Sequence, residues 1–276
     1  MMRSKGLVRE FRPILVFLCA IALVGPADAA CGQTAQAPAT TFEPKVGQPG
    51  KDVVWVPTPQ ELVDKMLDLA QVTKQDFLMD LGSGDGRTVI TAAKRGIRAQ
   101  GIEYNPEMVS LAQRNAAAAG VADRAVFTQA DLFATDFSKA QVITMFLLPS
   151  INMKLRPTIL NMRPGTRIVS NTFTMEDWQP DQSETIQDCA SWCTAHLWIV
   201  PAKVAGQWQM PQGTLTLTQE FQMVAGTLGS TPISGGRLRG DAFTFTVGNA
   251  VYNGRVEGNT IRGTVSGGGA FTATKR

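Results

Sequence analysis

Residues 80–87, "DLGSGDGR", carry the glycines and acids best suited to bind a ligand. Gly82, Gly84 and Gly86 stand at alternate positions between an apolar run and a segment with helical spacing. A glycine lets backbone N–H groups come close to a ligand, and a helix N-terminus adds further free donors. The sequence therefore predicts a loop whose backbone contacts a small molecule.

The spacing and the charge of this loop favour a cationic nucleoside over a dinucleotide. A dinucleotide fingerprint reads G-x-G-x-x-G, whereas this loop reads G-x-G-x-G and has Arg87 in place of the third dinucleotide glycine. A pyrophosphate about 4 Å from Asp85 would also meet a like-charge penalty on the order of 4 kcal/mol at an effective dielectric constant of about 20. S-adenosylmethionine carries an ammonium and a sulfonium and no phosphate, so the acids favour this cofactor. A nicotinamide-dependent oxidoreductase is the less favoured alternative.

Two further acids end the next two predicted strands. Glu103 stands in "GIEYN", where a carboxylate can accept hydrogen bonds from both ribose hydroxyls, each worth roughly 1.5–3 kcal/mol. Glu103 alone does not separate the two cofactors, because NAD sites use the same contact. Asp131 in "QADLF" is placed to meet the adenine amino group. A solvated strand end for Glu103 and a helix cap for Asp131 are the structural alternatives.

Strands and helices alternate through residues 53–202, a pattern typical of a mostly parallel sheet with right-handed crossovers. The first predicted helix, residues 58–70, has Thr58 and Glu61 at the spacing of a capping box. The predicted strands are 77–81, 99–103, 125–130, 141–148 and 166–173, and the further helices are 87–95, 106–119 and 151–160. Ligands bind such sheets beyond the carboxyl ends of the strands, so the glycine loop and both acids are expected at one site.

The pattern changes after about residue 203 to short segments that alternate apolar and polar residues. Gly, Asn and Asp separate these segments, which is typical of antiparallel strands joined by tight turns. We expect residues 203–276 to form a small antiparallel β domain, a meander or a partial barrel. Because few strands leave little interior space, we expect its inner face to be filled by side chains rather than to hold a ligand, with the core formed by Leu215, Leu217, Phe243 and Phe245.

The first 52 residues are interpreted as a signal peptide (1–30) and a flexible linker (31–52). A basic start, an apolar stretch and "PADAA" match a secretory leader, and the linker is rich in Ala, Pro, Gly, Thr and Gln. Lipoprotein processing at Cys31 is an alternative, but Asp28 stands where an aliphatic residue is needed. The apolar stretch is shorter than the ~20 residues of a membrane span, which disfavours an uncleaved anchor. We expect an exported, periplasmic or cell-envelope protein, or a cytoplasmic one if the leader is misread.

Charge and side-chain usage argue against several classes of site. The formal net charge of +3 falls to +1 without residues 1–30, so no basic field indicates nucleic-acid binding. Cys189 and Cys193 in "CASWC" match neither a CxxC redox motif nor a zinc site, and a disulfide and free buried thiols remain alternatives. His196 is the one histidine and lies in an apolar run, where a packed strand residue is expected. The sequence predicts no metal site.

Residues 55–202 resemble the class I S-adenosylmethionine-dependent methyltransferases through "DLGSGDGR", "GIEYNPEMV" and "ADLF". A narrower set, "VPTP", "MFLLP", "PGTRIVS" and "MEDWQPD", is similar to bacterial relatives of the mitochondrial lysine methyltransferases that modify the ATP synthase c-subunit. The resemblance implies a Rossmann-like seven-stranded sheet, S-adenosyl-L-methionine as cofactor, and methyl transfer to an acceptor such as a protein lysine. Where the family often has a histidine, in "VSHxF", this chain has Asn171. The family as a rule also lacks a C-terminal β domain.

The glycine loop, the acids at the strand ends and the resemblance to the methyltransferases together predict the cofactor-binding residues. These are Asp80, Gly82, Ser83, Gly84, Asp85, Gly86, Glu103, Tyr104, Asp131 and Leu132. Methyl transfer needs alignment more than a dedicated nucleophile, so no catalytic residue is assigned. The "MFLLP" segment is expected to shape the acceptor channel, and Trp178 is either a wall of the site or a packed indole. S-adenosylmethionine is made in the cytoplasm, where an exported enzyme does not work. The alternative function is therefore an exported, methyltransferase-like binding protein of the cell envelope without catalysis.

Overall fold

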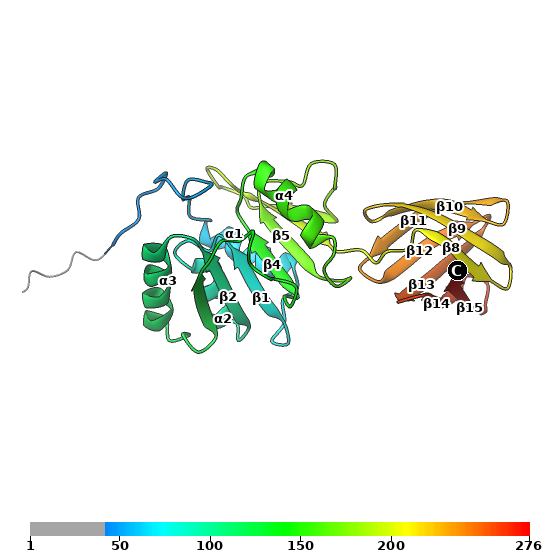
Figure 1. Cartoon of the computed structure of the whole chain (residues 1–276), viewed down its shortest axis with the longest axis horizontal. Coiled ribbons are helices and arrows are strands. Elements are labelled where there is room, and N and C mark those ends of the chain that lie inside the picture. Colours follow the sequence, from blue (N-terminus) through cyan, green and yellow to red (C-terminus); the bar gives the residue numbers. More distant parts are fainter. Residues whose placement is uncertain (1–41) are drawn as a thin grey trace, which may run out of the picture. The chain divides into compact units, whose positions relative to one another are not determined.

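The computed structural model describes residues 42–276, so the predicted signal peptide and the first half of the predicted linker lie outside the described residues. An α/β region comes first along the chain and a region made of strands alone follows from residue 206 (Figure 1). The predicted fold class, a seven-stranded α/β sheet followed by an antiparallel β domain, is confirmed. Within residues 42–276, none of the helices has the length and apolar character needed to cross a membrane.

The α/β region is built on a sheet with the strand order β3-β2-β1-β4-β5-β7-β6. The first five strands of that order run parallel, and β7 pairs antiparallel with both β5 and β6. The strand order reverses between β1 and β4, which makes their carboxyl ends the switch point of the sheet. The strands are β1 (Phe77–Leu81), β2 (Arg98–Glu103), β3 (Ala125–Gln129), β4 (Val142–Met145), β5 (Arg167–Asn171), β6 (Gln182–Thr185) and β7 (Thr194–Ile199).

Helices cover both faces of this sheet and form two cores. On one face α1 (Gln60–Leu69), α2 (Arg87–Lys94) and α3 (Pro106–Ala118) pack their apolar sides against the strands. On the other face α4 (Pro149–Ile159) packs against residues of β1, β4 and β5. All predicted strands and helices of this region are present. Strand β6 was not predicted because "QSET" is short and polar.

The predicted capping box of the first helix is wrong. Helix α1 begins at Gln60, and no side chain caps its N-terminus. The Thr58 hydroxyl instead accepts a hydrogen bond from Asn171 Nδ2 at 3.2 Å, at the end of β5. Asn105, by contrast, caps α3 by accepting from the Glu107 amide at 2.8 Å. Thr58 therefore links the segment before α1 to the carboxyl end of β5.

The C-terminal region is a closed barrel of eight antiparallel strands, not the open meander or partial barrel that the sequence predicts. Strand β15 pairs with β8, a strand that the sequence pattern did not indicate, and this pairing closes the ring. The predicted core is confirmed, because Leu215, Leu217, Phe243 and Phe245 are buried inside. The strands are β8 (Gly206–Met210), β9 (Gly213–Glu220), β10 (Met223–Leu228), β11 (Thr231–Arg239), β12 (Ala242–Val247), β13 (Ala250–Glu257), β14 (Thr260–Val265) and β15 (Ala270–Lys275).

Trp178, in the connection between β5 and β6, is a packed indole and does not line the cavity described below. Its ring stacks on Phe221 with 5.8 Å between centroids, and its Nε1 donates to Gln222 Oε1 at 2.8 Å. Gln222 is buried, and its Nε2 donates to the Gln179 carbonyl at 2.8 Å. Trp178 is thus held by the turn between β9 and β10, and Gln222 satisfies the buried Trp178 N–H as well as the Gln179 carbonyl.

Replacing Gln222 by Leu is expected to lower the free energy of unfolding by about 1–3 kcal/mol, because the Trp178 N–H and the Gln179 carbonyl lose their partners inside the protein. Gln207 is exposed on β8, so Gln207→Leu is the matched control and should change stability by less than about 0.5 kcal/mol. Urea unfolding followed by tryptophan fluorescence measures both variants. Equal stability of the two variants would contradict this role of Gln222.

Candidate active site

A cavity of about 510 Å³ lies at the carboxyl ends of the parallel strands, across the switch point. Small-molecule sites span roughly 300–1,000 Å³, so the volume suits a ligand of nucleoside size. Nine of the ten predicted cofactor residues line this cavity, and the tenth, Gly86, does not. The walls of the cavity are formed by residues 48–58, 80, 82–85, 87–88, 102–105, 130–132 and 145–148, with Met66, Met108, Ile151, Phe173 and Trp192.

The glycine loop is bare on its cavity side. Gly82 and Gly84 have φ of 78° and 53°, a region that L side chains rarely adopt. A Cβ on Gly84 would stand 2.7 Å from Trp55 Nε1, so a side chain there would push the indole away. Gly86 has a different task, because a Cβ on it would collide with Phe127 at 2.6 Å in the core. The prediction that Gly86 contacts the ligand is therefore replaced by a packing role.

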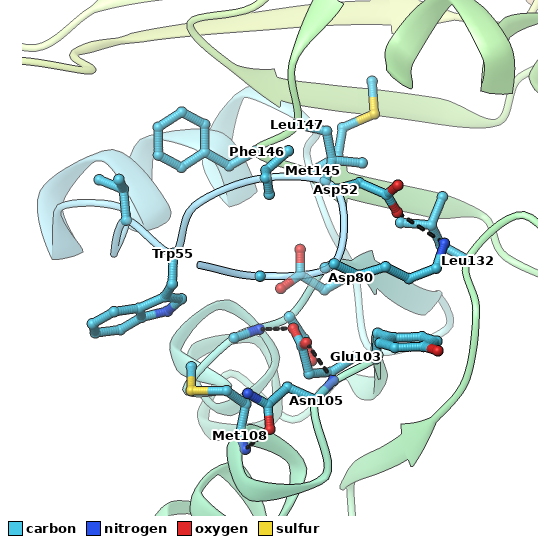
Figure 2. Close-up of a pocket in the computed structure, with 18 of the residues that line it drawn as sticks. Asp52, Trp55, Asp80, Glu103, Asn105, Met108, Leu132, Met145, Phe146 and Leu147 are labelled. Atoms are coloured by element: carbon cyan, nitrogen blue, oxygen red, sulfur yellow. Dashed lines mark hydrogen bonds and ion pairs between the residues drawn. The ribbon is translucent and has the colours of Figure 1, made fainter. Parts of the chain in front are cut away.

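Glu103 lies at the end of β2 and reaches into the cavity (Figure 2). One carboxylate oxygen accepts the Gly84 amide at 3.0 Å, and the other accepts the Asn105 amide at 2.9 Å. A carboxylate oxygen has more than one lone pair, so each keeps capacity for a ligand hydroxyl. The two amides fix the carboxylate in place and leave it able to hold a diol.

Two of the other predicted acids, Asp85 and Asp131, are already paired with bases. Asp85 forms a two-pronged ion pair with Arg87, with Nη2–Oδ2 at 2.6 Å and Nε–Oδ1 at 3.0 Å. Its charge is therefore compensated, which corrects the expectation that Asp85 attracts a cationic ligand. Asp131 accepts the Phe133 amide at 2.9 Å and lies 3.2 Å from Lys51 Nζ. These two contacts, the amide first, lower the pKa of Asp131.

Asp80, at the end of β1, is the unusual acid of the site. Its side chain is buried at 6% exposure and accepts a hydrogen bond from Thr144 Oγ1 at 2.7 Å. Burial raises the pKa of Asp80 to about 7, the Thr144 hydroxyl opposes this, and the charges of Asp85 and Glu103 add to it. A cation placed in the cavity would favour the ionised form, so Asp80 is a carboxylate that a positively charged ligand stabilises.

Ser83 carries a polar group without a partner. Its Oγ is buried and makes no hydrogen bond to any described residue, although Ser83 lines the cavity. Buried hydroxyls nearly always have partners, and a ligand in the cavity would supply one for Ser83. An unpartnered hydroxyl, a carboxylate with free lone pairs, a buried acid and a bare loop fit a nucleoside with a cationic side chain.

Several residues of the site were missed by sequence reasoning. Residues 48–58 form a strap over the glycine loop, in which the Trp55 amide donates to the Gln48 carbonyl at 2.9 Å. Part of this strap falls in the predicted linker, and Lys51 within it bonds with Asp131. The motif "VPTP" is the one signal that could have indicated it. Figure 2 places Trp55 and Leu132 at the rim around Asp80 and Glu103.

One side of the cavity is aromatic. Phe146 and Phe173, which follow β4 and β5, lie with ring centroids 5.9 Å apart, and Trp192 completes the group at 5.6 and 5.4 Å from them. Cys189 and Cys193, which flank Trp192, form a disulfide, so that alternative is confirmed. His196 lies in β7 as predicted, outside the cavity lining, and its Nε2 bonds with the Thr172 carbonyl.

The raised pKa of Asp80 predicts a pH-dependent stability. Because its pKa is higher in the folded protein than in the unfolded chain, the folded state binds the proton more tightly, and stability falls as pH rises from about 4 to about 7. Asp80→Asn cannot ionise and removes this loss. We expect the variant to gain about 2–3 kcal/mol more at pH 8 than at pH 5, relative to the unaltered protein.

Chemical denaturation at both pH values, without ligand, measures this difference. Asp123→Asn is the control, because Asp123 is exposed on the surface. It should change stability little at either pH. An equal effect of Asp80→Asn at pH 5 and pH 8 would show that Asp80 does not titrate between them.

Comparison with known proteins supports the same assignment. The family model described as the ANTKMT methyltransferase domain matches residues 80–182. A protein-lysine N-methyltransferase of Saccharolobus islandicus is 39% identical over 151 residues, which cover 54% of this chain and 94% of that relative. The lysine N-methyltransferase of Mus musculus that is named for the ATP synthase c-subunit is 32% identical over 130 residues. The match covers 47% of this chain and 52% of the mouse enzyme, so the chain spans about half the length of that relative.

A solved structure extends the likeness to the fold. The RNA methyltransferase from Salinibacter ruber, crystallised with S-adenosyl-L-homocysteine, is 47% identical, with a TM-score of 0.51. The match covers 54% of this chain and 96% of that one. These matches confirm the predicted activity and the predicted cofactor, S-adenosyl-L-methionine. The chain belongs to the family of S-adenosylmethionine-dependent methyltransferases that includes the protein-lysine N-methyltransferases.

Proposed function

We propose that this enzyme transfers a methyl group from S-adenosyl-L-methionine to the side-chain amine of a protein lysine. The observation that carries the proposal is the charge of the cavity. Five acids and two bases line it, and both bases are paired with acids of the lining. A cavity with excess negative charge attracts a cationic cofactor and an amine, and it repels phosphate groups. The acids are Asp52, Asp80, Asp85, Glu103 and Asp131, and the bases are Lys51 and Arg87.

The names of the similar proteins point to two different methyl acceptors. The archaeal and mouse relatives are named for lysine, and the Salinibacter ruber structure is named for RNA. RNA recognition relies on basic residues along the backbone path, together with stacking of bases on aromatic rings. The aromatic wall of this cavity suits both acceptors, whereas its acidic lining favours the amine. We therefore propose a lysine acceptor and leave RNA as an outcome of the test.

We assign the cofactor to the residues at the ends of β1, β2 and β3. Glu103 would hold the ribose hydroxyls, and the amides and hydroxyl of residues 82–84 would surround the methionine part, with Asp80 near its ammonium. Tyr104, Asp131 and Leu132 would border the adenine. Among these, the unpartnered Ser83 hydroxyl and the free lone pairs of Glu103 support the assignment.

The protein contributes alignment and exclusion of water. S-adenosylmethionine, when bound, supplies a methyl group already activated on a sulfonium. Alignment of two reactants lowers a barrier by roughly 7–11 kcal/mol, so no side chain needs to act as a base. The apolar wall at Phe146, Leu147 and Phe173 disfavours the charged amine and so lowers the lysine pKa. The neutral amine forms the new N–C bond as the S–C bond breaks with its electrons going to sulfur, and the methylated amine then loses a proton to solvent.

Glu103→Ala is expected to weaken S-adenosylmethionine binding at least 100-fold, since two charge-assisted hydrogen bonds are lost at about 1.5–3 kcal/mol each. Calorimetric titration of the purified protein measures this affinity. Glu107 is exposed on α3, and Glu107→Ala is the control that should leave affinity unchanged. Equal binding by both variants would contradict the assignment of Glu103.

The acceptor is tested by transfer of a tritiated methyl group to three probes. These are a pool of lysine-containing peptides, the same pool with arginine for lysine, and total RNA. We expect label in the first pool alone, and mass spectrometry should place it on the lysine nitrogen. Label in RNA would overturn the lysine acceptor. Tight cofactor binding without transfer to any probe would favour the alternative, a methyltransferase-like binding protein of the cell envelope.

We also propose that the enzyme works outside the cytoplasm. The predicted leader of residues 1–30 and the Cys189–Cys193 disulfide support this, because disulfides persist in oxidising compartments. Fractionation of cells that express a C-terminally tagged chain, with mass measurement of its N-terminus, tests it. We expect envelope localisation and cleavage near residue 30. An intact N-terminus in the cytoplasm would contradict export and would remove the difficulty of cofactor supply.

A further inference from the structure

Trp192 lines the cavity from a short loop and is partly exposed to solvent. It lies on the five-residue loop of residues 189–193 that the disulfide closes, and its side chain is 37% exposed. Its ring contacts those of Phe146 and Phe173, which form the aromatic side of the cavity. A large aromatic residue that is left partly exposed beside a cavity has unused binding surface.

The backbone that carries these rings is strained. Trp192 has φ of 60°, and Thr172, directly before Phe173, has φ of 59°. This left-handed region is disfavoured for residues with a side chain, and most of all for a β-branched one such as Thr. Strain of this kind persists where the surroundings enforce it, and it gathers at functional sites. Two strained positions thus aim two rings at the same part of the cavity.

Hydrogen bonds and the disulfide enforce this geometry. The Thr172 amide donates to the Thr194 carbonyl at 2.7 Å, and the Ile186 amide donates to the Cys193 carbonyl at 3.0 Å. Cys189 and Cys193 have Cα atoms 5.8 Å apart. Both pack against the core that α1, α2 and α3 form on one face of the sheet. The loop is therefore fixed at both ends, and the disulfide joins those ends directly around Trp192.

We propose that Trp192 is a specificity-determining residue that binds the acceptor side chain, and that the disulfide holds it in position. The inference rests on the proposed lysine acceptor. The rings of Trp192, Phe146 and Phe173 would pack against the alkyl chain of the lysine, and their apolar faces would favour the neutral amine that methyl transfer requires. The cofactor residues follow β1, β2 and β3, whereas these rings follow β4 and β5 or precede β7. Acceptor binding and cofactor binding are therefore separable.

The first test compares Trp192→Ala and Trp192→Phe in methyl transfer to the lysine peptide that the unaltered enzyme modifies best. We expect Trp192→Ala to raise the KM for the peptide at least tenfold and Trp192→Phe to restore most of the loss. The Kd for S-adenosylhomocysteine, measured by calorimetry, should stay within twofold in both. Phe133 is 40% exposed and does not line the cavity, so Phe133→Ala is the matched control with an unchanged KM.

The second test removes the disulfide. A dithiol reductant breaks the S–S bond by supplying two electrons and two protons, and is itself oxidised to a cyclic disulfide. We expect the reduced enzyme, and the variant with Cys189→Ser and Cys193→Ser together, to show the same rise in peptide KM with normal binding of S-adenosylhomocysteine. The reductant should have no further effect on that double variant.

The outcomes separate this inference from the proposed function. An unchanged peptide KM in Trp192→Ala, with the enzyme folded and active, overturns the role of Trp192. An effect of Trp192→Ala without any effect of reduction overturns the role of the disulfide. Absence of transfer to lysine by the unaltered enzyme refutes the acceptor class itself. If Trp192→Ala lowers the thermal unfolding temperature, Trp192→Phe and the reduced enzyme still decide the question.

Discussion

The site is organised around a buried carboxylate that lacks a cationic partner among the described residues. Asp80 lies one residue before the end of the central strand β1, where parallel pairing with β2 and β4 on both sides leaves it little contact with water. Burying a carboxylate away from water is unfavourable, and the hydrogen bond from the Thr144 hydroxyl offsets part of this desolvation penalty. The fold thus keeps an unfavourably buried carboxylate at the switch point, and a cation bound in the cavity would stabilise its ionised form. The bare loop and Glu103 line the same cavity as this carboxylate.

Much of this arrangement could be predicted from local pattern. Strand β1 is an apolar run that ends in an acid and a glycine loop, and parallel sheets bring such ends together. Glu103 and Asp131 could be placed for the same reason. Asp85 could not be interpreted correctly, because its neutralisation by Arg87 depends on side-chain geometry that spacing does not reveal. Gly86 was misassigned since glycine serves close ligand approach and close packing alike, and only the position of Phe127 distinguishes them.

Long-range contacts set the limit of prediction elsewhere. The capping box at Thr58 matched a local rule, but the partner of its hydroxyl is Asn171, 113 residues away. The strap over the glycine loop has little apolar pattern, and it is ordered by contacts such as Lys51 with Asp131. Closure of the barrel depends on β8, whose pairing partner β15 stands at the opposite end of the region. Where a contact joins distant segments, sequence periodicity carries little information about it.

The unpaired edges of the outer strands in residues 42–276 determine where another chain could pair with this one. The barrel closes on itself, so each of its eight strands has a neighbour on either side and presents no open row of backbone groups. The sheet keeps two outer strands, β3 and β6. Strand β6 is four residues long and carries "QSET", whose polar side chains discourage pairing with another chain. The other outer strand, β3, has an apolar side chain open to contact, because Val126 is 51% exposed.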